Sequence, residues 1–342
     1  MGFVALKIDT TLTGWLATMG KDAAAAESAG YAGIWTFEGA HDPFLPLLLA
    51  AEHTERVELG TSIAVAFARN PLLLATIAWD LQAYSRGRFV LGLGSQIRAH
   101  ITRRYSMPWS RPADRMRDMV LAVRAIWTSW EQGGRLDYQG EFYQHTLMPP
   151  LFRPAAAEVA GFGPPPIYLA GVGPAMTAVA GEVADGFMSH PFCTPRFLRE
   201  VTLPALTQGA TRAGKPVGDI VIHHSAMVAT GRSASELAAA RQAIRKQLAF
   251  YGSTPAYWPI LELHDRADLG PRLKTMSKTG EWDRMADLID DDFLDAVAIT
   301  ATDPVRAAAQ LHERYDGIVE RLGFNTPYRV DPVLLTELLR EL

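Results

Sequence analysis

The sequence predicts a single (β/α)8 barrel, the TIM-barrel fold, that extends over residues 1–342. Short apolar runs rich in β-branched residues alternate with longer segments of helical period, which is the pattern of parallel βα units. The alternation repeats eight times, and no shift in composition marks a second domain. An open doubly wound sheet would show the same alternation. Eight repeats favour closure into a barrel.

The expected strands are short and apolar, and each is followed by a segment in which apolar residues recur at helical spacing. The strands cover residues 4–9, 33–36, 56–63, 89–92, 166–169, 186–189, 219–228 and 296–300. The helices cover residues 20–30, 44–54, 71–85, 112–130, 175–183, 194–213, 233–250 and 304–315. Asn70 and Asp303 each precede a proline and are expected to cap a helix start.

Three long connections interrupt the repeat. They are residues 96–111 after the fourth strand, residues 137–165 before the fifth strand, and residues 252–291 between the seventh helix and the eighth strand. Long connections in a compact domain usually carry function or form lids. We therefore expect these insertions to border or cover the functional site.

Composition excludes several classes of protein. A net charge of −4 and a pI near 6.1 give no basic surface for nucleic acid. The longest apolar runs fall far short of the roughly 20 residues that span a bilayer, and the first residues read as a strand rather than as a secretory signal. The lone Cys193 has no partner for an internal disulfide. We expect a cytoplasmic protein without nucleic-acid or membrane partners.

Polar residues that follow the strands are the first candidates for chemistry, because barrel active sites lie at the carboxyl ends of the strands. Glu38, His41 and Asp42 follow the second strand. Carboxylates beside a histidine can position and tune the imidazole for proton transfer near neutral pH. The alternative is a solvated loop in which Asp42 caps the next helix.

Segments that contain small residues also follow the third and fourth strands. Ser62 and Ile63 come at the end of the third strand, and Gly94, Ser95 and Gln96 come at the end of the fourth. Small side chains let the backbone approach a flat ligand closely, although an ordinary strand exit would look the same. The glycines here lack the spacing of a dinucleotide-binding fingerprint.

A glycine-rich turn, Gly171-Val172-Gly173, joins the fifth strand to its helix. Unpaired backbone N–H groups and the helix dipole make such a turn a seat for phosphate, and a tight turn without a ligand is the alternative. No lysine follows in the manner of a nucleoside-triphosphate site.

The remaining polar residues point less directly to a function. The nine histidines show no metal-binding spacing. Strand alternation sends one of the adjacent pair His223 and His224 into the barrel and the other toward the helices. His190 follows the sixth strand at the mouth of the barrel, Cys193 is expected to pack as a small apolar residue, and residues 290–292 are expected to form a solvated acidic loop.

Taken together, these blocks resemble the bacterial luciferase-like superfamily, and within it the oxidoreductases that use the deazaflavin coenzyme F420. The blocks are residues 36–44, 59–71, 87–95, 171–174 and 184–187, in this order. The resemblance is best between residues 23 and 188 and extends beyond them by strand order and length.

The resemblance implies a deazaflavin or flavin ring that lies across the mouth of the barrel. It implies a non-prolyl cis peptide between Ser62 and Ile63 behind the ring, and a phosphate held by Gly171, Val172 and Gly173. Gly94, Ser95 and Gln96 fall in a block that borders the cofactor. His41 matches the histidine that lies near the reactive face of the ring.

The chain also departs from the family pattern. The acidic residue and the histidine after the second strand are adjacent in well-known members, whereas Gly39 and Ala40 separate Glu38 from His41 here. Gln96 stands near the position where sugar-phosphate-oxidising members carry a glutamate. A glucose-6-phosphate substrate is therefore not implied.

The predicted function is hydride transfer between C5 of F420 and a small organic substrate, with His41 as acid or base and Glu38 tuning it. Alternatives are an FMN-dependent monooxygenase, a non-redox lyase or isomerase, and a barrel that binds flavin without turnover. The family implies a homodimer, for which the helix of Trp127 and Trp130 offers an apolar face if these side chains do not belong to the core. Arg98, Arg103 and Arg104 are candidates to meet the anionic tail of the cofactor.

Overall fold

A computed structural model describes residues 6–342, and its parallel strands close into a ring. The ring order is β1 (Lys7–Thr11), β2 (Gly33–Thr36), β3 (Glu58–Thr61) with β4 (Ala64–Val65), β5 (Phe89–Gly94), β8 (Ile167–Gly171), β9 (Gly186–Ser189), β10 (Val221–Ala229) and β12 (Arg321–Asn325). β12 returns to β1, which completes the barrel and confirms the predicted fold class. Val4 and Ala5 of the first expected strand lie outside the described residues.

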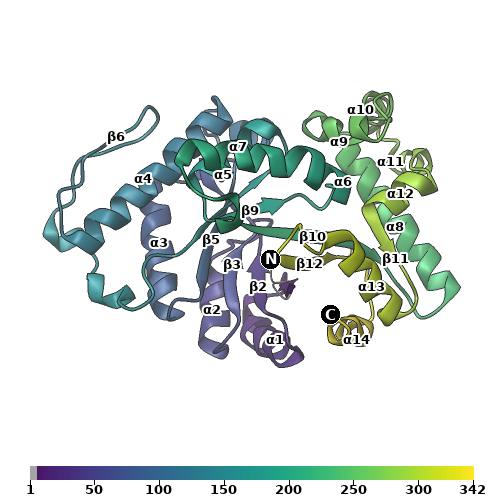
Figure 1. Cartoon of the computed structure of the whole chain (residues 1–342), viewed down its shortest axis with the longest axis horizontal. Helices are drawn as coiled ribbons and strands as arrows, with labels where there is room; N and C mark the ends of the chain where they lie inside the picture. Colours follow the sequence, from purple (N-terminus) through teal and green to yellow (C-terminus); the bar gives the residue numbers. More distant parts are fainter. Residues whose placement is uncertain (1–5) are drawn as a thin grey trace.

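Helices surround the strands (Figure 1). The outer layer contains α1 (Leu16–Ala29), α2 (Leu45–His53), α3 (Pro71–Tyr84), α4 (Pro112–Gln132), α5 (Pro174–Val183), α6 (Pro195–Phe197), α7 (Leu203–Ala213), α13 (Pro304–Tyr315) and α14 (Pro332–Arg340). The expected caps are present: Asn70 Oδ1 accepts from Leu72 N at 2.8 Å, and Asp303 Oδ1 accepts from Val305 N at 3.2 Å. Gly30 ends α1 in the left-handed region at φ 102°, where glycine is favoured.

The prediction of the eighth strand is wrong. Residues 296–300 contain β11 (Ala298–Thr300), which pairs with the end of β10 and not with β1. The eighth position belongs to β12, which lies between β10 and β1 and is followed by α14. β12 begins with Arg321 and has no β-branched residue, so its sequence does not resemble a buried strand. Ion pairing inside the barrel makes the burial of Arg321 possible.

The first two insertions lie where the sequence placed them. Residues 96–111 contain the short π-helix η2 (His100–Arg104). Residues 137–165 contain the hairpin β6 (Tyr138–Gln139) and β7 (Gln144–His145), with the short helices η3 (Pro150–Phe152) and η4 (Ala156–Val159). The hairpin projects at one end of the molecule in Figure 1.

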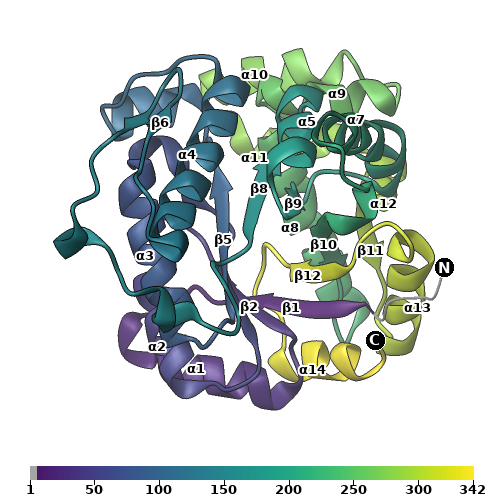
Figure 2. The ribbon, with the colours of Figure 1, turned by 60° about the vertical axis from the view of Figure 1, so that its left-hand side comes forward.

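The third insertion is longer than expected, because it includes the predicted seventh helix. It runs through α8 (Ala234–Gly252), η7 (Pro255–Tyr257), α9 (Trp258–Leu263), α10 (Leu269–Thr279), α11 (Trp282–Met285), η8 (Ala286–Leu288) and α12 (Asp291–Val297). Figure 2 shows α9 and α10 together at one edge of the molecule, near α7. Residues 290–292 are not a loop: Asp290 caps α12 through Phe293 N at 2.7 Å and pairs with Arg266.

Two apolar clusters form the core. The larger lies between the strands and the helices and includes Trp127 and Trp130, each 2% exposed. These two side chains therefore belong to the core and supply no surface for a second subunit. The smaller cluster, Trp35, Val90, Tyr168 and Met188, comes from strands alone and fills the barrel interior.

Charged side chains close the amino-terminal end of the barrel. Arg321 forms two hydrogen bonds with Asp9, at 2.8 and 2.7 Å, and pairs with Glu58 at 2.8 Å. His223 points inward to this group, with its Nε2 3.5 Å from Asp9 Oδ2. His224 points outward and reaches Tyr315 of α13, as the alternation predicted. The opposite, carboxyl end of the strands is left to form the site.

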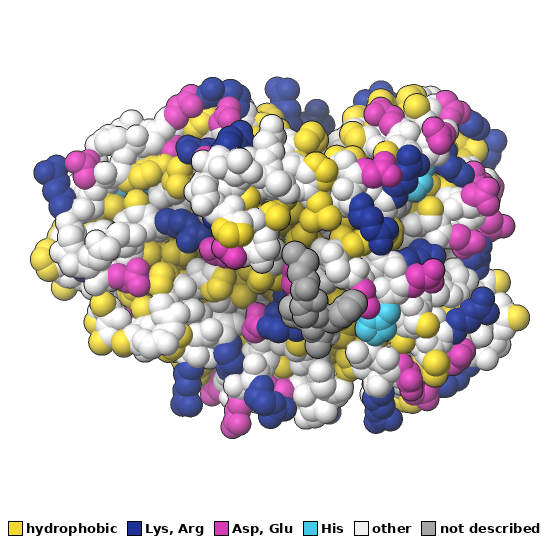
Figure 3. Space-filling model, in the orientation of Figure 1, with side chains coloured by type: hydrophobic (Ala, Val, Ile, Leu, Met, Phe, Trp, Pro, Cys, Tyr) yellow, Lys and Arg dark blue, Asp and Glu magenta, His cyan; other side chains and the backbone are white. Residues whose placement is uncertain are grey.

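The surface mixes charges of both signs, and the face in Figure 3 shows Lys and Arg interspersed with Asp and Glu. This distribution agrees with the net charge of −4 and gives that face no basic footprint. Among the helices that the structure describes, none has the length and apolar character needed to cross a membrane.

Candidate active site at the mouth of the barrel

The residues predicted to form the site gather at the carboxyl ends of the strands. They are Glu38 and His41 after β2, Ser62 and Ile63 between β3 and β4, Gly94, Ser95 and Gln96 at the end of β5, and Gly171, Val172 and Gly173 at the end of β8. In a barrel these ends share one face, so the fold alone brings these four segments to the same mouth.

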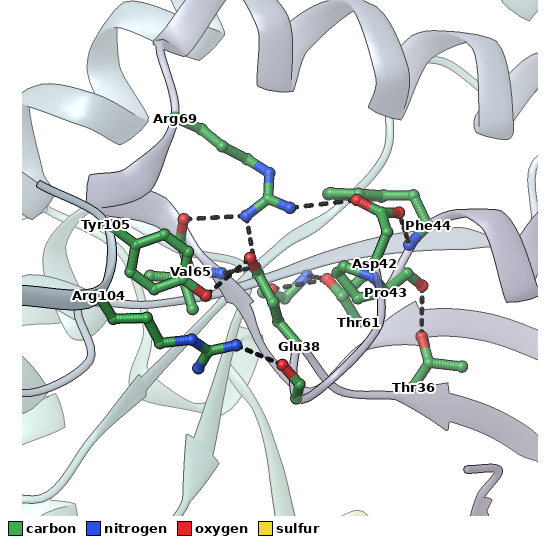
Figure 4. A network of polar contacts seen from close by, with 12 residues as sticks. Thr36, Glu38, Asp42, Pro43, Phe44, Thr61, Val65, Arg69, Arg104 and Tyr105 are labelled. Carbon is green, nitrogen blue, oxygen red and sulfur yellow. Dashed lines mark hydrogen bonds and ion pairs between the residues drawn. The ribbon is translucent and has the colours of Figure 1, made fainter. Parts of the chain in front are cut away.

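Glu38 is the centre of a network that joins three loops of the mouth (Figure 4). Its Oε2 accepts from Val65 N at 2.7 Å and from the Arg69 guanidinium, and its Oε1 accepts from the Tyr105 hydroxyl at 3.0 Å. The Glu38 side chain is 9% exposed. Arg69 also pairs with Asp42 at 3.3 Å. The carboxylate therefore connects the loops that follow β2, β4 and β5.

His41 lies in the same loop as Glu38 but does not join this network. Its side chain is exposed, whereas the neighbouring carboxylates of Glu38 and Asp42 are hydrogen-bonded. Asp42 caps α2 through Phe44 N at 2.8 Å, which is the alternative role considered for it. The expectation that Glu38 tunes His41 by contact is not met, because Arg69 and Tyr105 occupy the carboxylate.

Burial raises the pKa of the Tyr105 hydroxyl, and its hydrogen bond to Glu38 acts in the same direction. Tyr105 therefore stays protonated and donates to the carboxylate. Arg104 of η2 donates to the Gly39 carbonyl oxygen. The insertion after β5 is thus attached to the β2 loop at two neighbouring positions.

The segment between β3 and β4 forms an apolar bulge. The Ser62–Ile63 peptide is cis, as the resemblance implied. Ser62 N donates to the Thr36 carbonyl at 2.6 Å, which fixes the bulge against β2. A Cβ on Gly94 would come within 2.8 Å of Ile63 Cγ1. Glycine at this position therefore lets β5 pass directly beside the half-buried Ile63.

The turn after β8 offers backbone donors. α5 begins at Pro174, and no side chain of residues 6–342 caps it. The amides of a first helical turn have no acceptor within the helix, and a Cβ at Gly173 would meet no atom within 4 Å. The backbone N–H groups at the start of α5 therefore have no side-chain acceptor among the described residues. Ser95 and Gln96, by contrast, bond within their own turn, with Ser95 Oγ donating to the Gln96 carbonyl at 3.1 Å.

An aromatic cluster lies on the other side of the mouth. His190 follows β9, and its ring stacks on Tyr257 with centroids 4.4 Å apart and meets Tyr251 edge-on at 4.5 Å. Burial lowers the pKa of His190 to about 4. The sequence placed His190 at the mouth but missed both tyrosines, because they belong to the inserted segment and carry no motif of their own.

Comparison with known proteins agrees with this geometry. The family described as luciferase-like monooxygenase matches residues 9–321. The uncharacterized protein Rv1360 of Mycobacterium tuberculosis is 51% identical over 93% of this chain and 92% of its own length. The F420-dependent glucose-6-phosphate dehydrogenase of Amycolatopsis mediterranei is 25% identical over 89% of this chain and 84% of its own.

Among solved structures, the coenzyme F420-dependent tetrahydromethanopterin reductase of Methanopyrus kandleri superposes with a TM-score of 0.78. The match covers 99% of this chain and 97% of that one at 20% identity, and it shows the shared fold. The family match and the dehydrogenase relative make this chain a luciferase-like oxidoreductase. The chain belongs to the luciferase-like monooxygenase family, and its cofactor is a deazaflavin or a flavin.

Proposed function

We propose that this protein transfers a hydride between coenzyme F420 and a small organic substrate. The observation that carries the proposal is the pairing, at one mouth, of the Ile63 bulge beside Gly94 with the uncapped start of α5. A flat ring and a phosphate need these two features on adjacent strands, and β5 pairs with β8. The F420-dependent relatives favour the deazaflavin over FMN.

The residues present fit such a cofactor. Ile63 offers an apolar surface to the ring, and the turn from Gly171 to Gly173 offers backbone N–H groups to the phosphate. Arg98 and Arg103 are exposed on the neighbouring insertion and carry positive charge toward an anionic tail. When bound, the deazaflavin supplies the hydride chemistry at C5, while the protein supplies orientation and shelter from water.

His41 is the proposed acid or base. Its imidazole is exposed and lies in the loop after β2, so it can exchange a proton with solvent between turnovers. Glu38 takes a different role from the one first predicted. With Val65, Arg69 and Tyr105 on its oxygens, it holds the loop of His41 against the loops after β4 and β5. Glu38 is therefore a positioning residue.

The second candidate is an FMN-dependent monooxygenase, which the description of the matched family favours. The two functions differ in what oxidises the reduced cofactor. Protein mixed without oxygen with reduced F420 is expected to oxidise it when a carbonyl substrate is added, and dioxygen is expected to have no effect. Oxidation of reduced FMN that requires dioxygen and yields an oxygenated product would replace the proposal with the second candidate.

We also propose a homodimer formed through α2 and α3. Their outer faces expose Leu45 (51%), Leu48 (40%), Leu73 (65%) and Tyr84 (50%). Apolar side chains gathered on adjacent helices are typical of interfaces between subunits. Light scattering of the wild type is expected to give twice the chain mass, and Leu48→Glu with Leu73→Glu is expected to give one chain mass. A wild-type monomer would remove this proposal.

A further inference from the structure

We propose that His190 binds the oxygen of an uncharged carbonyl substrate, or of the corresponding alcohol, by donating a hydrogen bond from Nε2. The apolar body of the substrate would lie against the aromatic cluster that His190 forms with Tyr251 and Tyr257. This inference rests on the proposed function and adds the substrate class and a residue that selects it.

The position of His190 follows from strand alternation. Met188 points into the barrel, where it belongs to the inner cluster. Ser189 points outward and its hydroxyl bonds His224 Nδ1 at 2.7 Å. His190 therefore continues on the inward side, one residue beyond the end of β9. Ser189 pairs with Gly171 across the sheet, so His190 borders the turn proposed to hold the cofactor phosphate.

The inserted segment covers this position. Tyr251 comes from the end of α8 and Tyr257 from η7, and both contact the His190 ring. Two polar contacts attach the same segment to the loop after β9: the Thr194 hydroxyl to His264 at 2.8 Å, and Arg196 to the Leu263 carbonyl at 2.8 Å. The inserted segment is therefore firmly attached beside His190 at the mouth.

The hydrogen bonds of His190 fix its tautomer. Nδ1 accepts from Phe192 N at 3.2 Å, so this nitrogen carries no proton. A neutral imidazole must then carry its proton on Nε2, which makes Nε2 a donor. Within residues 6–342, the hydrogen bonds of this ring are limited to the one at Nδ1. Nε2 is thus available to an oxygen of the substrate.

The aromatic cluster around His190 disfavours a charged group on the substrate. The rings packed against His190 are those of Tyr251 and Tyr257, and Phe192 packs against both of these tyrosines. The pKa of His190 is lowered by burial alone, with no contribution from a charged neighbour. A phosphate or carboxylate would lose water here without gaining a counter-ion, which is strongly unfavourable. A ketone or alcohol needs one donor, and His190 provides it.

In the reductive direction, the substrate carbonyl carbon would gain a hydride from the reduced deazaflavin and its oxygen would gain a proton. The product is a secondary alcohol, and the deazaflavin would be in its oxidised form after the step. His190 donates only a hydrogen bond in this step, because its low pKa keeps the imidazole neutral near neutral pH and the Nε2–H of a neutral imidazole is too weak an acid to give up its proton. The proton is assigned to His41 under the proposed function.

Two variants separate the donor from the ring. His190→Phe keeps an aromatic ring against Tyr257 and removes the donor, whereas His190→Gln restores an N–H donor without the ring. Cyclohexanone is the probe, and cyclohexanecarboxylate is its charged counterpart. We expect KM for cyclohexanone to rise about 10-fold in His190→Phe, the effect of one lost hydrogen bond, and to return within about 3-fold of wild type in His190→Gln. An unchanged KM in His190→Phe, or equal affinity for the carboxylate, would overturn the proposal.

A second measurement does not depend on turnover. In the full chain labelled with 15N-histidine, NMR is expected to show His190 as the Nε2–H tautomer near neutral pH, and cyclohexanone is expected to shift its Nε2 signal with or without F420. The Nδ1–H tautomer, or no shift with the ketone, would contradict the proposal. If F420 fails to bind but the ketone still shifts this signal, the proposed function fails while the subsite stands.

Discussion

The two sides of the mouth are built from different chemistry. On the β2 side, Glu38, Arg69 and Tyr105 form a network of charged and hydroxyl groups. On the β9 side, His190, Tyr251 and Tyr257 form a cluster of uncharged aromatic rings. β2 and β9 are four positions apart in a ring of eight, so the two sides face each other across the mouth.

This difference divides the work of the site. A network of short polar contacts holds loops in one geometry, which hydride transfer at a bound ring requires. An apolar aromatic surface with a single hydrogen-bond donor selects substrates by shape and charge and tolerates variation in size. The β2 side is therefore expected to control rate and stability, and the β9 side to control which substrate is taken.

Removal of the proposed proton donor should have the largest effect. His41→Ala is expected to lower kcat about 100- to 10,000-fold, the usual contribution of general acid–base catalysis. The affinity for F420 should stay within a factor of about two by titration. The control is His312→Ala. His312 is a partly exposed histidine of α13, in the outer layer of helices, and its loss should leave kcat unchanged. Unchanged turnover in His41→Ala would remove this residue from the mechanism.

Disruption of the network should mainly affect stability. Glu38→Ala leaves the half-buried Arg69 guanidinium without its main counter-charge, and the free energy of unfolding in urea is expected to fall by about 3 kcal/mol. Asp283→Ala breaks the exposed Lys246–Asp283 pair and should cost less than about 1 kcal/mol. Equal losses in both variants would show that the network does not hold the mouth together.

Acid should destabilise the β9 side through His190. Its pKa is about 4 in the folded protein against a usual value of 6.5, so the unfolded chain takes up the proton first as the pH falls. The contribution of the neutral His190 to stability is therefore fully present above pH 6.5 and is lost between pH 6.5 and pH 4. Nearby Tyr251, Tyr257 and Cys193 stay uncharged in this range, because burial raises the pKa of each.

His190→Phe isolates this contribution. His224 titrates in both proteins, so the part of its pKa shift that comes from burial cancels in the comparison, whereas the part that comes from His190 is lost together with His190. The wild type should lose about 2 kcal/mol more unfolding free energy than His190→Phe over this window, as urea melts at several pH values would show. Parallel curves for the two proteins would contradict the assigned burial of the imidazole.

The smallest effect is expected from the hydroxyl of Tyr105. Tyr105→Phe removes one donor from Glu38 and keeps the other two, so the unfolding free energy should fall by about 1 kcal/mol. Thr207→Val, which removes an exposed hydroxyl from α7, should change it by less than about 0.5 kcal/mol. A loss near 3 kcal/mol in Tyr105→Phe would make the hydroxyl, rather than Arg69, the main partner of Glu38.

Sequence reasoning reached the barrel and most of the mouth because both depend on local patterns. Apolar runs, capping residues such as Asn70 and glycine turns such as Gly171 to Gly173 are visible within a few residues. β12 was missed because Arg321 is compatible with a buried strand only when Asp9 and Glu58 lie beside it. The pairing of Arg321 with Asp9 joins residues 312 positions apart and leaves no local signal.

The contacts of the site residues were harder to predict than the residues themselves. Glu38 and His41 were found by their position after β2, but proximity in sequence suggested a contact that Arg69 and Tyr105 replace. The aromatic cluster around His190 depends on an insertion whose helices carry no recognisable motif. Only the fold shows that Tyr251 and Tyr257 reach His190.

The central claim is that this mouth binds a deazaflavin, and a parallel titration of the purified protein with F420 and with FMN tests it most directly. The account predicts saturable binding of F420 and much weaker binding of FMN. It also predicts that Gly173→Asp, which places a carboxylate at the proposed phosphate turn, weakens F420 binding at least about 10-fold. Tight binding of FMN with no measurable affinity for F420 would contradict the account.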